Sequence, residues 1–213
     1  MASEGLRPKL PWAKKLTIEY GQALFILDNI FYDKTRYVTR SVANHLNDIS
    51  KINAELVVST LKRWKASGKQ NSKEMDYIIS HALRTLVKQG NEEALALLGF
   101  KKDPKIVLSD LKLYQDEVRL GEALIFHFEI EAKEDCNLLI DYIMHFKTKS
   151  SKISPKVHKI KQFYLKAGES MEITKKYPFK ANMTTRKLYV GEHTVELQIN
   201  GICYVKNTFV LTN

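Results

Sequence analysis

The sequence predicts a two-domain α + β protein, with an α-solenoid of HEAT-like repeats over residues 1–102 and an immunoglobulin-like β-sandwich over residues 103–213. Three observations support this fold class. The first part of the chain contains an internal repeat with helical periodicity. Beyond Pro104 the apolar residues change to a period of two. About six or seven short runs of this second kind follow one another, which is typical of a β-sandwich.

The internal repeat becomes visible when the sequence is shifted by 37 residues. VANHLNDISK (residues 42–51) then aligns with ISHALRTLVK (residues 79–88). In each copy a turn, at Asn53 or Asn91, precedes a further apolar helical run. A period in the thirties built from helix, turn and helix is typical of an α-solenoid, in which no unit buries its apolar face alone. Two units are fewer than such a stack normally needs, so we expect repeats before Met1 or a cap formed by the rest of the chain.

The helices of the repeat each combine an apolar stripe with a polar face. In the helix from about Tyr37 to Ser50 the stripe contains Val38, Val42, Leu46 and Ile49. Its polar face contains Arg40, Asn44, Asn47 and Asp48. In the later helix the stripe contains Ile79, Ala82, Leu83 and Leu86, and the outward residues are His81, Arg84, Thr85 and Lys88.

These polar faces predict a binding groove. Equivalent helices that line one surface would present Arg40, Asn44, Arg84 and Lys88 around Asp48. The alternative is an ordinary solvated helix face, which is the default for polar positions. The two amides on the first helix favour a binding surface, because Asn is a poor helix former that gains little in mid-helix without a partner.

Basic residues are concentrated in one window. The chain has 34 Lys and Arg against 24 Asp and Glu, a net charge of +10. Residues 147–187 contain twelve basic and two acidic residues and therefore carry +10 by themselves. Such a charge attracts phosphate backbones, so we expect a polyanion such as DNA to bind here. The residues expected to contact it are Lys156, Lys159, Arg186 and Lys187. An anionic membrane surface is the alternative, but the window reads as strands and loops rather than as an amphipathic helix.

Composition otherwise predicts a cytoplasmic protein that associates with the nucleoid and has no membrane partner. No apolar run approaches the ~18 residues that span a bilayer, and the N-terminal sequence has no secretory signal. Cys136 and Cys203 are the two cysteines, and no C-x-x-C or Cys/His cluster accompanies them. The six His residues show no ligand spacing. We therefore expect reduced thiols, no metal and no cofactor.

The expected strands follow a boundary between Gly99 and Val107. A two-residue turn at Asn200-Gly201 predicts a hairpin between the last two strands. No Cys-Trp-Cys signature specifies a true immunoglobulin domain. The predicted strands cover residues 124–131, 138–146, 158–165, 170–178, 193–199 and 204–211.

Several long segments resemble a known family. ASEGLRPKLPW (residues 2–12), YVTRSVANHLNDIS (37–50) and SHALRTLVKQGNEEALALLGF (80–100) are similar to the central and C-terminal repeats of AlkC-type DNA alkylation repair glycosylases. SPKVHK (154–159) and TTRKLYVGEHTVELQING (184–201) resemble the immunoglobulin-like domain of that family. The resemblance implies hydrolysis of the N-glycosidic bond of cationic N-alkylated bases, chiefly 3-methyladenine, in double-stranded DNA.

The resemblance also implies roles for three residues. Glu4 and Asp48 would be the catalytic carboxylates that face the lesion, and Trp12 would lie against the deoxyribose or the neighbouring backbone. A cationic base is a good leaving group, so the enzyme has mainly to stabilise an oxocarbenium-like sugar and to position water. The alternatives are an exposed Asp48 paired with Arg40 or Arg84, a capping role for Glu4 and a core position for Trp12. Trp64 is predicted to be core.

The chain departs from the family at its start, because AlkC chains carry further repeats and a further active-site carboxylate before the ASEG motif. We therefore expect either a truncated or split member of the family, or a chain whose upstream half is supplied by a separate polypeptide. Two hypotheses follow: a glycosylase fragment that uses Glu4 and Asp48, or a non-catalytic DNA-binding module.

Overall fold

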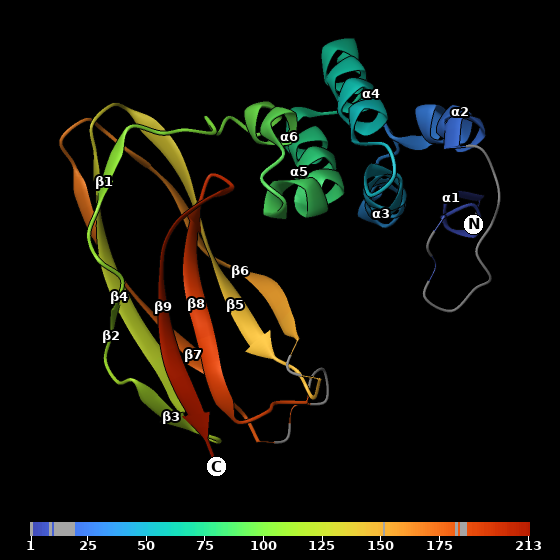
Figure 1. The fold of residues 1–213 in the computed structure, drawn as a ribbon. Helices are drawn as coiled ribbons and strands as arrows, with labels where there is room; N and C mark the ends of the chain where they lie inside the picture. The colour runs from blue at the N-terminus through green and yellow to red at the C-terminus, as the bar shows by residue number, and fades with distance from the viewer. Residues whose placement is uncertain (1, 9, 11–19, 151, 182, 184–186) are drawn as a thin grey trace. The chain divides into compact units, whose positions relative to one another are not determined.

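The computed structural model describes residues 2–8, 10, 20–150, 152–181, 183 and 187–213. The chain divides into two compact units, Met1–Gly99 and Phe100–Asn213. In the described residues, the first unit contains helices and the second contains strands (Figure 1). We call them the helical unit and the β unit.

The helical unit uses asparagine to begin its helices. Asn53, Asn71 and Asn91 each accept, through the side chain, a hydrogen bond from a backbone N–H in the first turn of the helix that follows. The turns predicted at Asn53 and Asn91 are therefore confirmed. Gly68 ends α4 with φ of 64°, a left-handed conformation that favours glycine. The helices are α1 (Ala2–Gly5), α2 (Tyr20–Ile30), α3 (Arg36–Ser50), α4 (Ala54–Ser67), α5 (Ser72–Lys88) and α6 (Glu92–Leu97).

The core of the helical unit lies where α3 packs on α5. Both predicted apolar stripes are buried, except that Val38 is only half-buried. Trp64 of α4 is also core, as predicted: it is 1% exposed, stacks on Phe31 and donates its indole N–H to Asp28 Oδ1 over 2.6 Å. Because the structure describes only a few helices, the HEAT-like solenoid remains a prediction.

The β unit contains two sheets. In the first, β4 pairs with β7 along one edge and with β1 and β2 along the other. The second has the order β3-β9-β8-β5-β6, antiparallel except for the β3 and β9 pair. The strands are β1 (Ile106–Leu108), β2 (Lys112–Leu113), β3 (Glu117–Arg119), β4 (Ala123–Ala132), β5 (Cys136–Lys147), β6 (Ile153–Leu165), β7 (Ser170–Pro178), β8 (Gly191–Ile199) and β9 (Ile202–Thr212).

One apolar core joins the two sheets into a sandwich. It includes Phe126 and Phe128 of β4 and Leu138, Ile140 and Phe146 of β5, all of them buried. The alternation predicted for both strands is therefore confirmed, and so are the positions of β6 to β9. The short strands β1 to β3 were not predicted, because two or three residues are too few to show a period.

The predicted hairpin turn joins β8 to β9. Asn200 and Gly201 have φ of 45° and 81°, the left-handed conformations that a two-residue hairpin turn requires. The Asn200 side chain is fully buried. Its Oδ1 accepts from the Leu139 N–H, and its Nδ2 donates to the carbonyls of Asn137 and Lys101. The turn is thereby fixed to the rest of the β unit.

Candidate functional site

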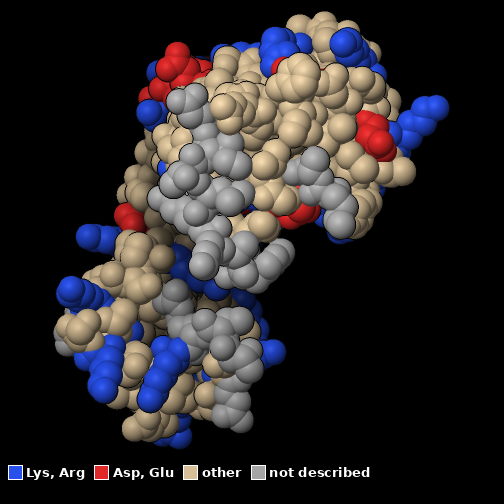
Figure 2. All heavy atoms as spheres, turned by 90° about the vertical axis from the view of Figure 1, so that its right-hand side faces the viewer, with Lys and Arg blue, Asp and Glu red and all other residues tan. Residues whose placement is uncertain are grey.

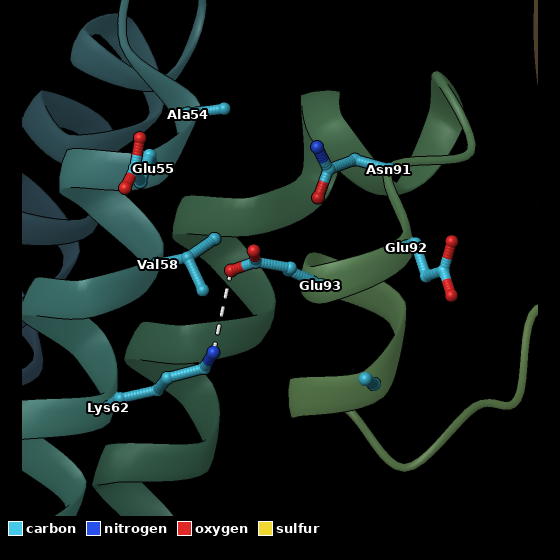
Figure 3. Close-up of a pocket in the computed structure, with 8 residues that line it drawn as sticks. Ala54, Glu55, Val58, Lys62, Asn91, Glu92 and Glu93 are labelled. Atoms are coloured by element: carbon cyan, nitrogen blue, oxygen red, sulfur yellow. Dashed lines mark hydrogen bonds and ion pairs between the residues drawn. The ribbon is translucent and has the colours of Figure 1, made fainter.

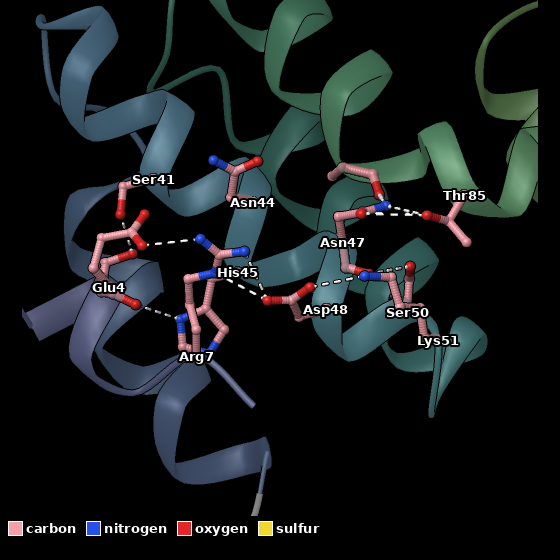
Figure 4. Close-up of polar contacts among 12 residues, drawn as sticks. Glu4, Arg7, Ser41, Asn44, His45, Asn47, Asp48, Ser50, Lys51 and Thr85 are labelled. Atoms are coloured by element: carbon pink, nitrogen blue, oxygen red, sulfur yellow. Dashed lines mark hydrogen bonds and ion pairs between the residues drawn. The ribbon is translucent and has the colours of Figure 1, made fainter. Parts of the chain in front are cut away.

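One guanidinium joins the two predicted catalytic carboxylates (Figure 4). Arg7 Nη1 donates to Glu4 Oε2 over 2.9 Å. Arg7 Nε donates to Asp48 Oδ2, also over 2.9 Å, and Arg7 Nη2 lies 2.9 Å from the same oxygen. Glu4 belongs to α1, Arg7 follows it, and Asp48 lies in α3, so packing of α1 on α3 brings the three side chains together.

Asp48 is buried, and this corrects the sequence-based expectation. It is 2% exposed, whereas Arg40, its expected neighbour on a polar outer face, is exposed. The alternative of an exposed Asp48 paired with Arg40 or Arg84 does not hold either: the ion-pair partners of Asp48 are Arg7 and Lys51, and Lys51 Nζ lies 2.9 Å from Oδ1. The segment around α1 covers this face of α3, and periodicity within α3 cannot reveal that cover.

His45 fastens α1 to α3 beside these carboxylates. Its Nδ1 lies 2.9 Å from the Ser3 carbonyl oxygen, which can only accept, so Nδ1 carries the proton. The side chain is fully buried, and its Nε2 has no hydrogen-bond partner among the residues described. Burial lowers the pKa of His45, and the nearby charge of Arg7 lowers it further. The imidazole is therefore neutral at pH 7.

A second polar cluster connects α3 to α5. Asn44 Oδ1 lies 2.9 Å from His81 Nε2 and accepts from Arg84 Nη2 over 3.1 Å. Burial lowers the pKa of His81, and the charges of Arg84 and Arg40 add to this effect. Of the predicted groove, the structure thus brings Asn44 and Arg84 together, while Arg40 and Lys88 have exposed side chains.

Asn47 does not face the groove. It is 2% exposed and donates through Nδ2 to the Ala82 carbonyl oxygen, over 2.9 Å, and to Thr85 Oγ1. Its expected place on the outward polar face is therefore wrong. This amide gains its mid-helix partner from α5 and so contributes to packing.

The basic window lies on the β unit. Lys156 and Lys159 are exposed on β6, which is an edge strand, and Lys187 is also exposed. Figure 2 shows Lys and Arg side chains over the visible face of this unit, in the lower part of the view. In the parts of the window that the structure describes, no Lys forms an ion pair with an acidic side chain. Two predicted site residues, Trp12 and Arg186, lie outside the described residues.

Sequence reasoning missed Arg7, Lys51 and His45. Arg7 lies within the ASEGLRPKLPW segment, three residues after Glu4, and Lys51 lies three residues after Asp48. An acid followed by a cation at this spacing is a recognisable signal for an ion pair on a helix. No local signal predicts the contact between His45 and Ser3.

A separate pocket of about 690 Å³ lies between α4 and α6 (Figure 3). Its lining combines acidic side chains with small apolar ones, and Lys62 and Glu93 form an exposed ion pair across it at 3.4 Å. It contains none of the predicted site residues.

Among the described helices, none is long and apolar enough to cross a membrane.

Comparison with known proteins identifies the family. Residues 107–213, half of the chain, match the family described as "Uncharacterised protein YhaZ, C-terminal Ig-like domain". The chain belongs to this YhaZ family. The match confirms the predicted immunoglobulin-like domain.

Two relatives extend over nearly the whole chain. "Uncharacterized protein YhaZ" of Bacillus subtilis (strain 168) is 38% identical over 204 residues, which are 94% of this chain and 56% of that protein. A solved structure of the Pseudomonas fluorescens alkylpurine DNA glycosylase AlkC, bound to DNA containing an abasic site analog, matches with a TM-score of 0.92 and 34% identity. That match covers 99% of this chain and 59% of AlkC, so the YhaZ-family chain spans little more than half the length of either relative.

Proposed function

We propose that this chain acts in DNA alkylation repair, by hydrolysing the N-glycosidic bond of cationic N-alkylated bases such as 3-methyladenine in duplex DNA. The observation that carries the proposal is the similarity to AlkC over 99% of the chain at 34% identity. The convergence of Glu4 and Asp48 on Arg7 supports it, because it places two carboxylates at one locus. The HEAT-like arrangement of the helical unit belongs to the same proposal.

Carboxylates suit this chemistry. The alkylated base leaves with its bonding electrons and becomes neutral, while positive charge develops on the sugar. Anionic groups that are already in place stabilise that charge without reorganising. Asp48 is held by two hydrogen-bonded cations and is nearly buried, so its position is well defined. In this proposal Asp48 is the main stabilising group, and Glu4, whose side chain is 37% exposed, lies at the solvent side.

Basic residues would hold the duplex. We assign phosphate contacts to Lys156, Lys159 and Lys187 of the β unit, together with Arg186. In the helical unit we assign them to Arg40, Asn44, Arg84 and Lys88. Trp12 is assigned to the sugar beside the lesion.

One observation favours a second function, that of a non-catalytic DNA-binding module. Both oxygens of Asp48 are engaged by cations, Oδ1 by Lys51 and Oδ2 by Arg7. A carboxylate in a permanent pair of this kind stabilises the fold and is not available to the sugar. Base release separates the two functions, because a binding module retains DNA affinity and releases nothing.

Base release from methylated duplex DNA therefore tests the proposal. We expect the chain to release 3-methyladenine, and Asp48→Asn to lower the rate on the order of a hundredfold or more. DNA affinity should stay level or rise, because a negative charge is removed near the phosphates. Glu93→Gln is the control: it removes an exposed acid of the helical unit and should leave the rate unchanged. Undiminished release by Asp48→Asn would remove Asp48 from the mechanism, and DNA binding without release would favour the binding module.

A further inference from the structure

Arg7 is a planar cation enclosed by the two carboxylates that the proposed function assigns to a cationic substrate. Every hydrogen bond that its guanidinium makes to a described residue is to Glu4 or Asp48. The side chain of Asp48 is 3% exposed, that of Arg7 12% and that of Glu4 37%. Burial alone would lower the pKa of Arg7, but hydrogen bonds and charge from Glu4 and Asp48 outweigh it and raise the pKa. The site between them therefore favours a positive charge.

Arg7 can leave this site without removing every hydrogen-bond partner of Asp48. It uses only Oδ2, whereas Lys51 holds Oδ1 from the same helix end. Arg7 lies just after α1, where its backbone N–H donates to the Glu4 carbonyl oxygen over 3.2 Å, so displacement requires only that its side chain turn away. Without Arg7, Asp48 keeps Lys51 as its hydrogen-bonded cation among the described residues, and Glu4 loses its ion-pair partner. Such a site has an excess negative charge that another cation can neutralise.

We propose that the space between Glu4 and Asp48 is a binding site for a planar organic cation, which Arg7 occupies in the free protein and which a cationic ligand takes by displacing Arg7. The identity of that ligand, an alkylated base or a positively charged sugar, rests on the proposed function; the site itself does not. Arg7 is thereby a specificity-determining residue.

Charge replacement is the physical reason for the selectivity. A cationic ligand that displaces Arg7 restores the neutralisation of Asp48, whereas a neutral ligand leaves a nearly buried carboxylate short of one partner. Breaking a buried pair by removal of one member is strongly unfavourable, so neutral bases are rejected by the cost of uncovering Asp48. Arg7 therefore competes with cationic ligands and at the same time excludes neutral ones.

Chemical rescue tests the site directly. Arg7→Ala removes the atoms that ethylguanidinium replaces, so we expect ethylguanidinium chloride to raise the melting temperature of this variant in a saturable way. Sodium chloride at equal concentration serves as the salt control. Two further variants should show no saturable rise: Arg7→Ala/Asp48→Asn, which loses the buried carboxylate, and Arg36→Ala, which breaks the exposed pair of Arg36 with Glu74. If Arg7→Ala does not fold, Arg7→Gln replaces it in the same titration. Equal responses of the Arg7 and Arg36 variants would overturn the proposal.

A second measurement links the site to DNA. The probes are two duplexes that carry, at one abasic position, either a protonated pyrrolidine or a neutral tetrahydrofuran. We expect Arg7→Gln to increase the preference for the pyrrolidine duplex about tenfold, because the internal competitor is gone, and Asp48→Asn to abolish that preference. An unchanged preference in Arg7→Gln would contradict the displacement of Arg7. Rescue by ethylguanidinium together with an absence of base release would leave the cation site standing and would refute only the proposed reaction.

Discussion

At the scale of single residues, the environment of each polar side chain decides its chemistry more than its type does. Asp48 and Asp33 are both aspartates of the helical unit. Asp33 is only partly buried, in the segment between α2 and α3, where hydrogen bonds from the Thr35 side chain and backbone lower its pKa. Asp48 is nearly buried between Arg7 and Lys51. The second environment excludes water and holds the carboxylate in one position, which is what an electrostatic catalyst requires.

His45 should make the stability of the helical unit depend on pH. Its pKa is lowered in the folded chain, mainly by burial, so the unfolded chain binds the proton more readily. The free energy of unfolding should therefore fall as the pH decreases through about 6.5, the unfolded value. His45→Asn keeps a donor near the Ser3 carbonyl and should flatten this dependence. Because the pKa of His81 is also lowered, the free energy of unfolding of His45→Asn should still depend weakly on pH.

Urea unfolding at pH 7.5 and pH 5.5 measures the effect. Trp64 lies in the core of the helical unit and residues 100–213 contain no tryptophan, so intrinsic fluorescence reports on the helical unit. Equal slopes for the wild-type chain and His45→Asn would mean that the imidazole does not gain a proton on unfolding in this range.

At the scale of elements, buried amides fix the packing of helix on helix and of strand on turn. Asn47 reaches from α3 to the backbone of α5, and Asn200 reaches from the turn after β8 to β5. A buried hydrogen-bonding group that loses its partner costs about 1–3 kcal/mol, so these amides fix one arrangement of the elements.

Replacement of Asn47 should weaken the contact between α3 and α5. Asn47→Ala leaves the Ala82 carbonyl without its donor, and we expect a loss of about 1–3 kcal/mol in the free energy of unfolding. Asn29→Ala is the matched control, because Asn29 makes an exposed hydrogen bond within α2 and should cost less than about 1 kcal/mol. Tryptophan fluorescence during urea unfolding measures both. Equal losses would show that the bond to α5 does not stabilise the contact.

Asn200 should respond differently to two substitutions. Asn200→Gly keeps the left-handed turn but removes the acceptor of the Leu139 N–H, whereas Asn200→Ala also strains the backbone at φ of 45°. We therefore expect faster hydrogen exchange at the Leu139 amide in both variants and a larger loss of stability in Asn200→Ala. Greater stability of Asn200→Ala than of Asn200→Gly would contradict the role of the turn conformation.

At the scale of the whole molecule, positive charge is distributed unevenly along the chain. Residues 147–187 hold as much net charge as the entire chain, and their described lysines have no acidic partner. Unpaired exposed lysines are ready to displace the counterions of a phosphate backbone, which makes binding dependent on salt.

Replacement of Lys156, Lys159, Arg186 and Lys187 by Ala should weaken binding to all duplex sequences alike. Each lost phosphate contact lowers the slope of log affinity against log salt by about 0.9, so the slope should become clearly shallower. Replacement of four lysines elsewhere on the β unit, Lys102, Lys105, Lys112 and Lys206, is the matched control for net charge. Fluorescence anisotropy across a salt series measures both variants. The same slope for the two variants would mean that the window has no special contact with DNA.

The sequence by itself determined the element types, the positions of the longer strands, the buried stripes of α3 and α5 and the concentration of charge. These features depend on residues a few positions apart, so periodicity and composition record them. Only the tertiary structure decided the setting of the candidate site. Arg7 lies 41 residues from Asp48, and Asn47 lies 35 residues from Ala82. Helical periodicity shows on which side of α3 a polar residue lies. Whether that side faces water, α5 or the segment around α1 depends on which elements pack against the helix.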